Sequence, residues 1–207
     1  MDRQTVYLHR PRLYDFLDLP FEYGRYRRLR RRMFEGLSGR LLDAGVGTGR
    51  NIAFYPDGGP DGSEVTGIDL SPAMIARARR RSEKLGRAVD LREMDVSATA
   101  FPDNHFDAVI ATFLFCVLEK DQQLPALMEL ARVCREGGEI RLLDYVYSEN
   151  PVRRFVMRLW APWVRAVFGA AFDRDTERYI AAAGLELLER RFLVSDVIRL
   201  LVLRPKA

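Results

Sequence analysis

The feature that most constrains the fold is a regular alternation of short apolar runs with helical stretches, which begins near residue 39. The apolar runs predict strands, and longer segments with helical spacing predict the helices between them. We expect strands at residues 39–45, 64–70, 88–95 and 139–147 and one that begins at 106, with helices at 48–55, 71–86 and 120–138. Strands that alternate with helices predict a parallel sheet covered on both faces.

The C-terminal part departs from this alternation. Residues 150–183 are basic and helical in pattern, and residues 185–205 predict two strands joined by a tight turn around Val194–Ser195. A hairpin that completes a parallel sheet requires at least one antiparallel strand. The sequence therefore predicts an α/β fold with an antiparallel strand near its C-terminus.

The first expected strand runs directly into a glycine loop, DAGVGTG (43–49), with three glycines at alternate positions. This spacing is not the G-x-G-x-x-G of a dinucleotide fold, whose third glycine would fall at Arg50, and no G-K-S/T follows to make a P-loop. Asp43 would repel a phosphate but favour a ligand cation, and the helix N-terminus after the loop can receive a carboxylate. The loop therefore favours an amino acid joined to a nucleoside.

Two further acids end the next expected strands. Asp69 ends VTGID, and a carboxylate at that place can accept hydrogen bonds from both hydroxyls of a ribose. Asp95 follows in REMDV and could accept from an adenine amino group. A single acid at a strand end is more often a helix cap, but three acids at successive strand ends share the crevice where open α/β sheets bind ligands.

These segments resemble, in order and spacing, the motifs of class I S-adenosylmethionine-dependent methyltransferases. The matching segments are DAGVGTG (43–49), GIDLSPAMIARAR (67–79), Asp95–Val96, FPDNHFDAVIATFLFCVL (101–118) and LARVCREGGEIRLLDY (130–145). The resemblance covers about residues 38–147. It implies a Rossmann-like seven-stranded sheet with helices on both faces and an antiparallel last strand. It also implies S-adenosyl-L-methionine as the cofactor and S-adenosyl-L-homocysteine as the product.

The resemblance implies roles for individual residues. Asp43 and the glycines would lie near the methionine part of the cofactor, Asp69 on its ribose, and the Asp95 region at its adenine. The residues expected to bind the cofactor are Asp43, Gly45, Gly47, Gly49, Asp69, Leu70, Met74, Asp95, Val96, Thr112 and Phe113. Thr112 and Phe113 would line the methyl-transfer side.

We expect a single methyltransferase domain over residues 1–207. Its expected parts are an N-terminal helical segment (1–37) that acts as a lid or faces a membrane, a cofactor-binding core (38–147), a helical substrate-side segment (148–184) and a terminal hairpin (185–207). The N-terminus lacks a secretory signal, no apolar run is long enough to span a bilayer, and the two cysteines make no disulfide framework. These features predict a cytoplasmic protein, and the scarcity of Cys and His argues against a metal site.

Methyl transfer requires mainly that the nucleophile, the methyl carbon and the sulfur be held in line, so no obligate base is identified. Tyr14 and Tyr145 are the candidate catalytic residues, each with a packing role as the alternative. After the fourth expected strand there is no N-P-P-Y-like tetrapeptide of the enzymes that methylate amino groups of nucleic acids. The apolar segment TFLFCVL stands there instead and favours an apolar or lipidic acceptor.

Two segments combine arginines with aromatic residues. The stretch RYRRLRRR (25–32) contains six arginines in eight residues. The second segment, PVRRFVMRLWAPWVRAVF (151–168), supplies the candidate substrate or membrane residues Arg153, Arg154, Arg158, Trp160 and Trp163. This composition suits a helix lying on an anionic membrane, which would make the protein peripheral on the inner membrane face. The alternative is an amphipathic helix that covers the core and is interrupted at Pro162.

Within the class, the chain looks most like small bacterial phosphatidylethanolamine N-methyltransferases, quinone C-methyltransferases and alkyl-thiol methyltransferases. The expected activity is methyl transfer to a small or lipidic acceptor, with the phospholipid amine ahead of a quinone precursor or a small thiol. A non-catalytic methyltransferase-like binding module and a nucleic-acid-binding protein that uses the arginine run are the rivals from other classes.

Overall fold

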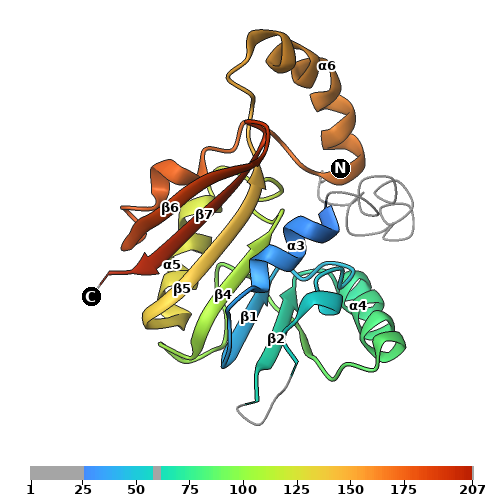
Figure 1. Ribbon diagram of the computed structural model, residues 1–207, viewed down its shortest axis with the longest axis vertical. Coiled ribbons are helices and arrows are strands. Elements are labelled where there is room, and N and C mark those ends of the chain that lie inside the picture. Colours follow the sequence, from blue (N-terminus) through green and yellow to red (C-terminus); the bar gives the residue numbers. More distant parts are fainter. Residues whose placement is uncertain (1–25, 58–61, 207) are drawn as a thin grey trace.

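The computed structural model of the protein describes residues 26–57 and 62–206. These residues form a sheet of seven strands in the order β3-β2-β1-β4-β5-β7-β6 (Figure 1). The strands are β1 (Arg40–Ala44), β2 (Glu64–Asp69), β3 (Asp90–Glu93), β4 (Phe106–Thr112), β5 (Cys134–Tyr145), β6 (Leu185–Val194) and β7 (Ile198–Pro205). Strands β1 to β5 pair in parallel, and β7 runs antiparallel to both β5 and β6. The predicted sheet is confirmed, with the antiparallel last strand inserted between β5 and β6.

The order of the strands reverses at β1. The chain first moves outward through β2 to β3 and then returns to β4 on the other side of β1. Where the order of an open α/β sheet reverses, a crevice forms outside the carboxyl ends of the strands, and ligands bind there. The ends of β1 and β4 therefore locate the candidate site.

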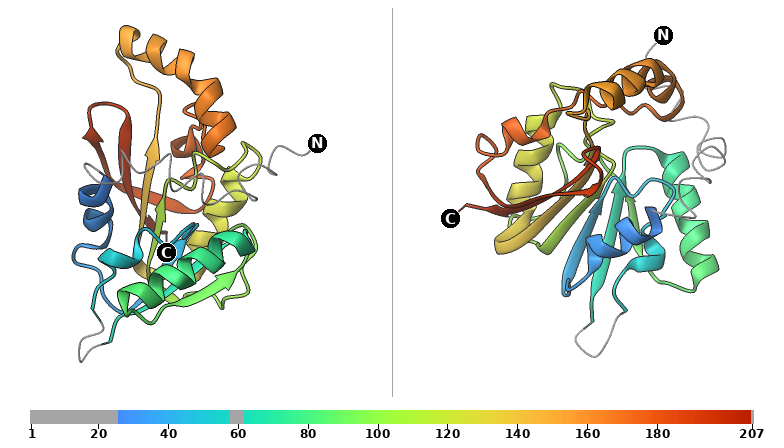
Figure 2. Two further views of the ribbon diagram at one scale, coloured as in Figure 1. Left: turned by 90° about the vertical axis from the view of Figure 1, so that its right-hand side faces the viewer. Right: turned by 45° about the horizontal axis from the view of Figure 1, so that its top comes forward.

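Helices cover both faces of the sheet. Because side chains alternate along a strand, Leu41 packs with α3 (Arg27–Phe34) and α4 (Pro72–Leu85) on one face. Leu42 packs with α5 (Gln123–Val133) on the other face. Figure 2 shows α3 and α5 on opposite sides of the sheet. The predicted helix 71–86 is confirmed, since the Ser71 hydroxyl accepts from the Met74 N–H and Gly86 ends the helix at φ 63°.

Two predicted helical segments are wrong in extent. The helix expected at 48–55 is a single 3₁₀ turn, η2 (Ile52–Phe54). The helix expected to end at the paired glycines stops at Val133, and both glycines lie within β5. A Cβ at Gly138 would lie 2.8 Å from the carbonyl oxygen of Asp107, so this glycine permits β5 to pass close to β4 at a β-bulge.

Helix α6 (Pro151–Phe168) stands away from the sheet (Figure 1). Among the residues of α6, only Met157 is buried. The helix therefore does not cover the core, contrary to the alternative interpretation. The predicted interruption at Pro162 is also wrong, because the helix continues through it. At an exposed position water can satisfy the carbonyl group that a proline leaves without its donor. No helix in the described part of the chain is long and apolar enough to cross a membrane.

A polar cluster on α5 ties the segment after β3 to the helix layer. Glu129 Oε1 accepts from the Thr99 N–H at 2.8 Å and from the Thr99 hydroxyl at 2.6 Å. Arg132 donates to both oxygens of Glu129, at 2.9 and 2.6 Å. The guanidinium of Arg132 and the Thr99 donors lower the pKa of Glu129 from 4.5 to about 2.

Replacing Glu129 with glutamine is expected to lower the free energy of unfolding by about 2 kcal/mol at pH 7. Because the folded-state pKa is depressed, the stabilisation is present above pH 4.5 and is lost as the pH falls toward 2. Urea unfolding at several pH values should therefore show the wild type and the variant converging in acid. Glu83→Gln, at an exposed position of α4, is the control and should follow the wild type throughout. A difference for Glu129→Gln that is independent of pH would contradict the prediction.

Candidate active site

The glycine loop between β1 and η2 forms the floor of the candidate site. Gly45, Gly47 and Gly49 have φ values of 72°, 55° and 77°, which favour glycine. A Cβ at Gly47 would have its nearest neighbour 4.0 Å away, at the carbonyl oxygen of Gly45. The loop thus presents bare backbone on an open side, which suits close approach of a ligand.

Asp43 lies fully buried beneath this loop. The Asn51 side-chain amide donates to both of its oxygens at 3.0 Å, and the Tyr55 hydroxyl donates to Oδ2 at 2.6 Å. Arg30 of α3 donates to the side-chain oxygen Oδ1 of Asn51 at 3.0 Å. Burial raises the pKa of Asp43 to about 6 despite these donors. The donors from Asn51 and Tyr55 thus hold the Asp43 carboxyl group in place next to the glycine loop.

Three members of this network were missed from the sequence, namely Arg30, Asn51 and Tyr55. Arg30 was interpreted only as part of a basic run, yet it is 7% exposed. Asn51 and Tyr55 stand four residues apart in NIAFYP (51–56), which follows the glycine loop. That spacing, with Asp43 upstream, is the signal that could have identified them.

Asp69 at the end of β2 lies at the rim of the loop. Its Oδ2 accepts from the Gly47 N–H and its Oδ1 from the Ser71 N–H, both at 2.9 Å. Burial raises its pKa. Each carboxylate oxygen has two lone pairs, so both can accept a further hydrogen bond from a ligand hydroxyl. This arrangement fits the predicted ribose site.

The residues expected around adenine differ in accessibility. Leu70 is 51% exposed beside Asp69, whereas Met74 is fully buried and Val96 nearly so. Asp95 is exposed, and its Oδ1 accepts from the N–H and the hydroxyl of Ser97, at 2.8 and 2.7 Å. Leu70 therefore offers an apolar surface next to Asp69, while one oxygen of Asp95 caps the following turn.

An aromatic cluster lies at the ends of β4 and β5. Thr112 accepts from the Asn51 amide at 3.3 Å, and the Phe113 ring stacks on Tyr145 with centroids 4.8 Å apart. Tyr26, at the start of α3, lies 5.5 Å from the Phe113 ring, and its hydroxyl is hydrogen-bonded to that of Tyr145. The structure thus brings the candidate Tyr145 together with Thr112 and Phe113 and adds Tyr26, which the sequence did not single out. Tyr14 lies outside the described residues.

The candidate substrate residues lie apart from the glycine loop, on α6. Arg153 pairs with Asp196 in the β6–β7 turn, and Arg154 lies over the Tyr147 ring at 5.7 Å. Trp160 and Trp163 pack edge to face, at 58% and 43% exposure. Arg158 is exposed on the same helix. Arg153 and Arg154 therefore anchor the start of α6, while the two tryptophans face outward.

A parallel sheet that reverses at β1, a glycine loop after β1 and acids at the ends of β1 and β2 are the features of class I S-adenosylmethionine-dependent methyltransferases. The methyltransferase domain family matches residues 41–138. The chain is 36% identical over 154 residues to the phosphatidylethanolamine N-methyltransferase of Cereibacter sphaeroides, covering 73% of this chain and 72% of that protein. The chain belongs to this methyltransferase family, and it is an enzyme that uses S-adenosylmethionine.

Two further comparisons agree with this assignment. The chain is 38% identical over 170 residues to the demethylmenaquinone methyltransferase of Thermus thermophilus, covering 80% of this chain and 76% of that protein. Its fold matches a geranyl diphosphate methyltransferase solved in complex with S-adenosylmethionine, with a TM-score of 0.64 and 17% identity over 86% of this chain and 83% of that one. Within the described residues, no three Cys, His, Asp or Glu side chains are grouped so as to hold a metal ion.

Proposed function

We propose that the protein methylates the amino group of phosphatidylethanolamine at a membrane surface. The observation that carries the proposal is the exposed surface of α6, which combines hydrophobic and basic side chains. This helix lies beyond the carboxyl ends of the strands, the end of the sheet at which the candidate site lies (Figure 1). The relative from Cereibacter sphaeroides, a phosphatidylethanolamine N-methyltransferase, supports the same acceptor.

The glycine loop and its acids would hold the cofactor. The buried carboxylate of Asp43 and the bare backbone at Gly47 suit the cationic amino acid end of the ligand. The Asp69 carboxylate, which accepts one hydrogen bond at each oxygen, suits its ribose. Leu70 and Asp95 would lie at its adenine. When bound, S-adenosylmethionine supplies a methyl group activated on a sulfonium. The chain's own residues then need mainly to orient the acceptor and exclude water.

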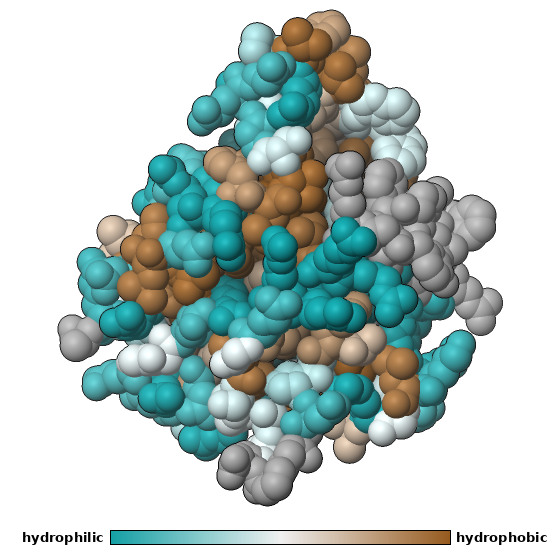
Figure 3. All heavy atoms as spheres, viewed as in Figure 1, coloured by the Kyte–Doolittle hydropathy of each residue, from teal (hydrophilic) through white to brown (hydrophobic). Residues whose placement is uncertain are grey.

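The face of α6 has the composition of an interfacial helix. Its exposed hydrophobic residues are Val152, Phe155, Val156, Leu159, Trp160 and Trp163, with exposures from 43% to 72%. Figure 3 shows hydrophobic atoms next to hydrophilic ones at the top of the molecule, over α6. Tryptophan favours the membrane interface, and arginines attract anionic headgroups and can bind a phosphate. In this proposal, α6 binds the membrane surface, and the phospholipid then enters the site from there.

A turnover assay on vesicles tests this proposal. Vesicles of phosphatidylethanolamine and phosphatidylglycerol should bind the protein and release S-adenosylhomocysteine. The double variant Trp160→Ala/Trp163→Ala should bind these vesicles roughly tenfold less tightly, with unchanged affinity for S-adenosylhomocysteine in calorimetry. Leu85→Ala and Met128→Ala remove exposed hydrophobic side chains from α4 and α5 and serve as controls. Equal vesicle binding by the double variant and the wild type would contradict the membrane role of α6.

Other acceptors give different outcomes in the same assay. Turnover on a demethylated quinone would favour ring C-methylation, for which the relative from Thermus thermophilus is the support, and turnover on a small thiol would favour S-methylation. Cofactor binding with no turnover on any acceptor would indicate a binding module. Titration against RNA and DNA at several salt concentrations completes the set, since tighter binding to nucleic acid than to vesicles would overturn the lipid proposal.

A further inference from the structure

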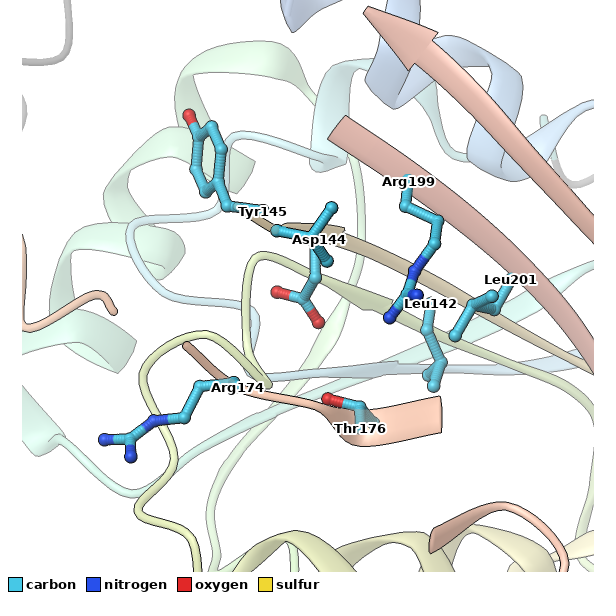
Figure 4. Close-up of a pocket in the computed structure, with 8 residues that line it drawn as sticks. Leu142, Asp144, Tyr145, Arg174, Thr176, Arg199 and Leu201 are labelled. Carbon is cyan, nitrogen blue, oxygen red and sulfur yellow. The ribbon is translucent and has the colours of Figure 1, made fainter. Parts of the chain in front are cut away.

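A small cavity with a few polar groups in a largely apolar lining lies beside the site, between β5, β7 and the segment that leads into η3 (Thr176–Tyr179). Figure 4 shows the Asp144 carboxylate, the Arg199 guanidinium and the Thr176 hydroxyl turned toward one space, while the guanidinium of Arg174 points away from it. The cavity has a volume of about 10 Å³. That volume holds a single water molecule.

Asp144 is the residue that this cavity leaves incompletely bonded. It is 9% exposed, and its Oδ1 accepts from the Cys116 N–H at 3.0 Å. Its Oδ2 is buried and has no hydrogen-bond partner among the described residues. Burial raises the pKa of Asp144 to about 7. A buried carboxylate oxygen without a donor is costly, so its bonding needs an explanation.

The lining of the cavity supplies the partners that one water needs. Thr176 gives its hydroxyl proton to the Gln123 side-chain oxygen at 2.8 Å, so the Thr176 oxygen can accept from a water. Arg199 uses one N–H for Glu177, at 2.6 Å, and its guanidinium has further donors. A water in this space can therefore donate to Asp144 Oδ2 and to Thr176 while it accepts from Arg199. The arginine makes the space unfavourable for a metal cation.

The groups around the cavity hold a single loop, residues Phe113–Leu118, which we call the β4 loop. Asp144 binds the N–H of Cys116 in this loop. Gln123, the partner of Thr176, donates to the carbonyl oxygens of Phe115 and Leu118 at 2.7 and 3.1 Å. The β4 loop begins with Phe113, whose ring stacks on Tyr145. Asp144 thus contacts the β4 loop directly, and Thr176 reaches it through Gln123. This loop carries Phe113 of the aromatic cluster.

We propose that the cavity holds one ordered water shared by Asp144, Arg199 and Thr176, and that Asp144 is thereby a positioning residue for the β4 loop on the acceptor side of the site. Asp144 does not touch the acceptor. It acts by fixing the backbone that orients Phe113 against Tyr145. The acceptor side of this inference rests on the proposed function, whereas the water and the loop do not.

Two measurements test the water and the loop without any acceptor. A high-resolution crystal structure should show an ordered water within hydrogen-bond distance of Asp144, Arg199 and Thr176. Amide hydrogen exchange at Cys116 should be about tenfold faster in Asp144→Ala than in the wild type. Asp144→Asn should restore protection, because its amide can accept from Cys116 and donate to the water. Asp175→Ala, at an exposed acid of the same segment, is the control.

Kinetics on phosphatidylethanolamine test the acceptor side. Asp144→Ala should lower kcat/KM for this lipid about tenfold, Asp144→Asn should recover most of it, and affinity for S-adenosylhomocysteine should be unchanged in both. If Asp144→Ala does not fold, Thr176→Val should loosen the same loop, since it removes the water's acceptor and the donor to Gln123.

Three results would overturn the inference. They are a dry cavity with Asp144 bonded directly to Arg199, an Asp144→Asn variant as impaired as Asp144→Ala, and a loss of S-adenosylhomocysteine affinity equal to the loss of turnover. Absence of phosphatidylethanolamine turnover in the wild type would instead count against the proposed function alone, because the crystal structure and the exchange rates still decide the role of Asp144.

Discussion

Asp69→Ala is expected to abolish measurable cofactor binding. The Asp69 carboxylate already fixes the glycine loop through the N–H of Gly47 and the start of α4 through the N–H of Ser71. In the proposed complex the same two oxygens accept from both ribose hydroxyls. Loss of two charge-assisted hydrogen bonds costs about 3 to 5 kcal/mol, or roughly a hundred- to several-thousandfold in affinity. Calorimetric titration with S-adenosylhomocysteine measures this directly.

Two further variants make the Asp69 result interpretable. Asp69→Asn keeps one acceptor oxygen and should bind the ligand with intermediate affinity. Asp95→Ala removes an exposed carboxylate expected only at the adenine amino group, and it should weaken binding several times less than Asp69→Ala. Thermal unfolding checks that each variant is folded. Near-normal affinity in a folded Asp69→Ala protein would refute the ribose assignment.

The fold was predictable because its determinants are local. Short apolar runs, the Ser71 cap and the Gly86 stop act over a few residues, and all of them are visible in the sequence. The end of α5 was not predictable for the opposite reason. Paired glycines after a helix usually end it, but a Cβ at Gly138 would lie 2.7 Å from the Cys134 Sγ and 2.8 Å from the Asp107 carbonyl oxygen. The second of these contacts joins segments that are distant in the sequence.

The residues of the candidate site also fall into those that local sequence patterns predicted and those that depend on contacts between distant segments. Asp43, the glycines and Asp69 were predicted because each ends a strand or turns a loop. Arg30 was missed because a run of six arginines gives no sign of which one is buried, and its partner Asn51 is 21 residues away. Asp144 was missed as a positioning residue because its surroundings come from the β4 loop, β7 and the start of η3. Such clusters exist only after the sheet has formed.

Gly49→Ala is expected to have the second largest effect, on folding rather than on binding. Gly49 has φ 77°, and a Cβ there would lie 2.7 Å from the Ile52 side chain and 3.0 Å from the Ala78 Cα of α4. The left-handed backbone and the overpacking against a helix together cost about 2 to 5 kcal/mol. Urea unfolding should show this loss without added ligand, and a midpoint equal to that of the wild type would contradict it.

Gly47→Ala is the matched comparison. Both glycines have a positive φ, but only Gly49 is closely surrounded by other atoms. Its φ is 55°, and a Cβ there would meet its nearest atom only at 4.0 Å. We therefore expect a loss of about 1 to 2 kcal/mol from the backbone alone. Its new methyl group would occupy the open side of the loop, so affinity for S-adenosylhomocysteine should fall more than stability does. Normal affinity in Gly47→Ala would mean that the open side of the loop does not face the ligand. A stability loss as large as that of Gly49→Ala would mean that close packing against the protein, and not the ligand, is what requires glycine at this position.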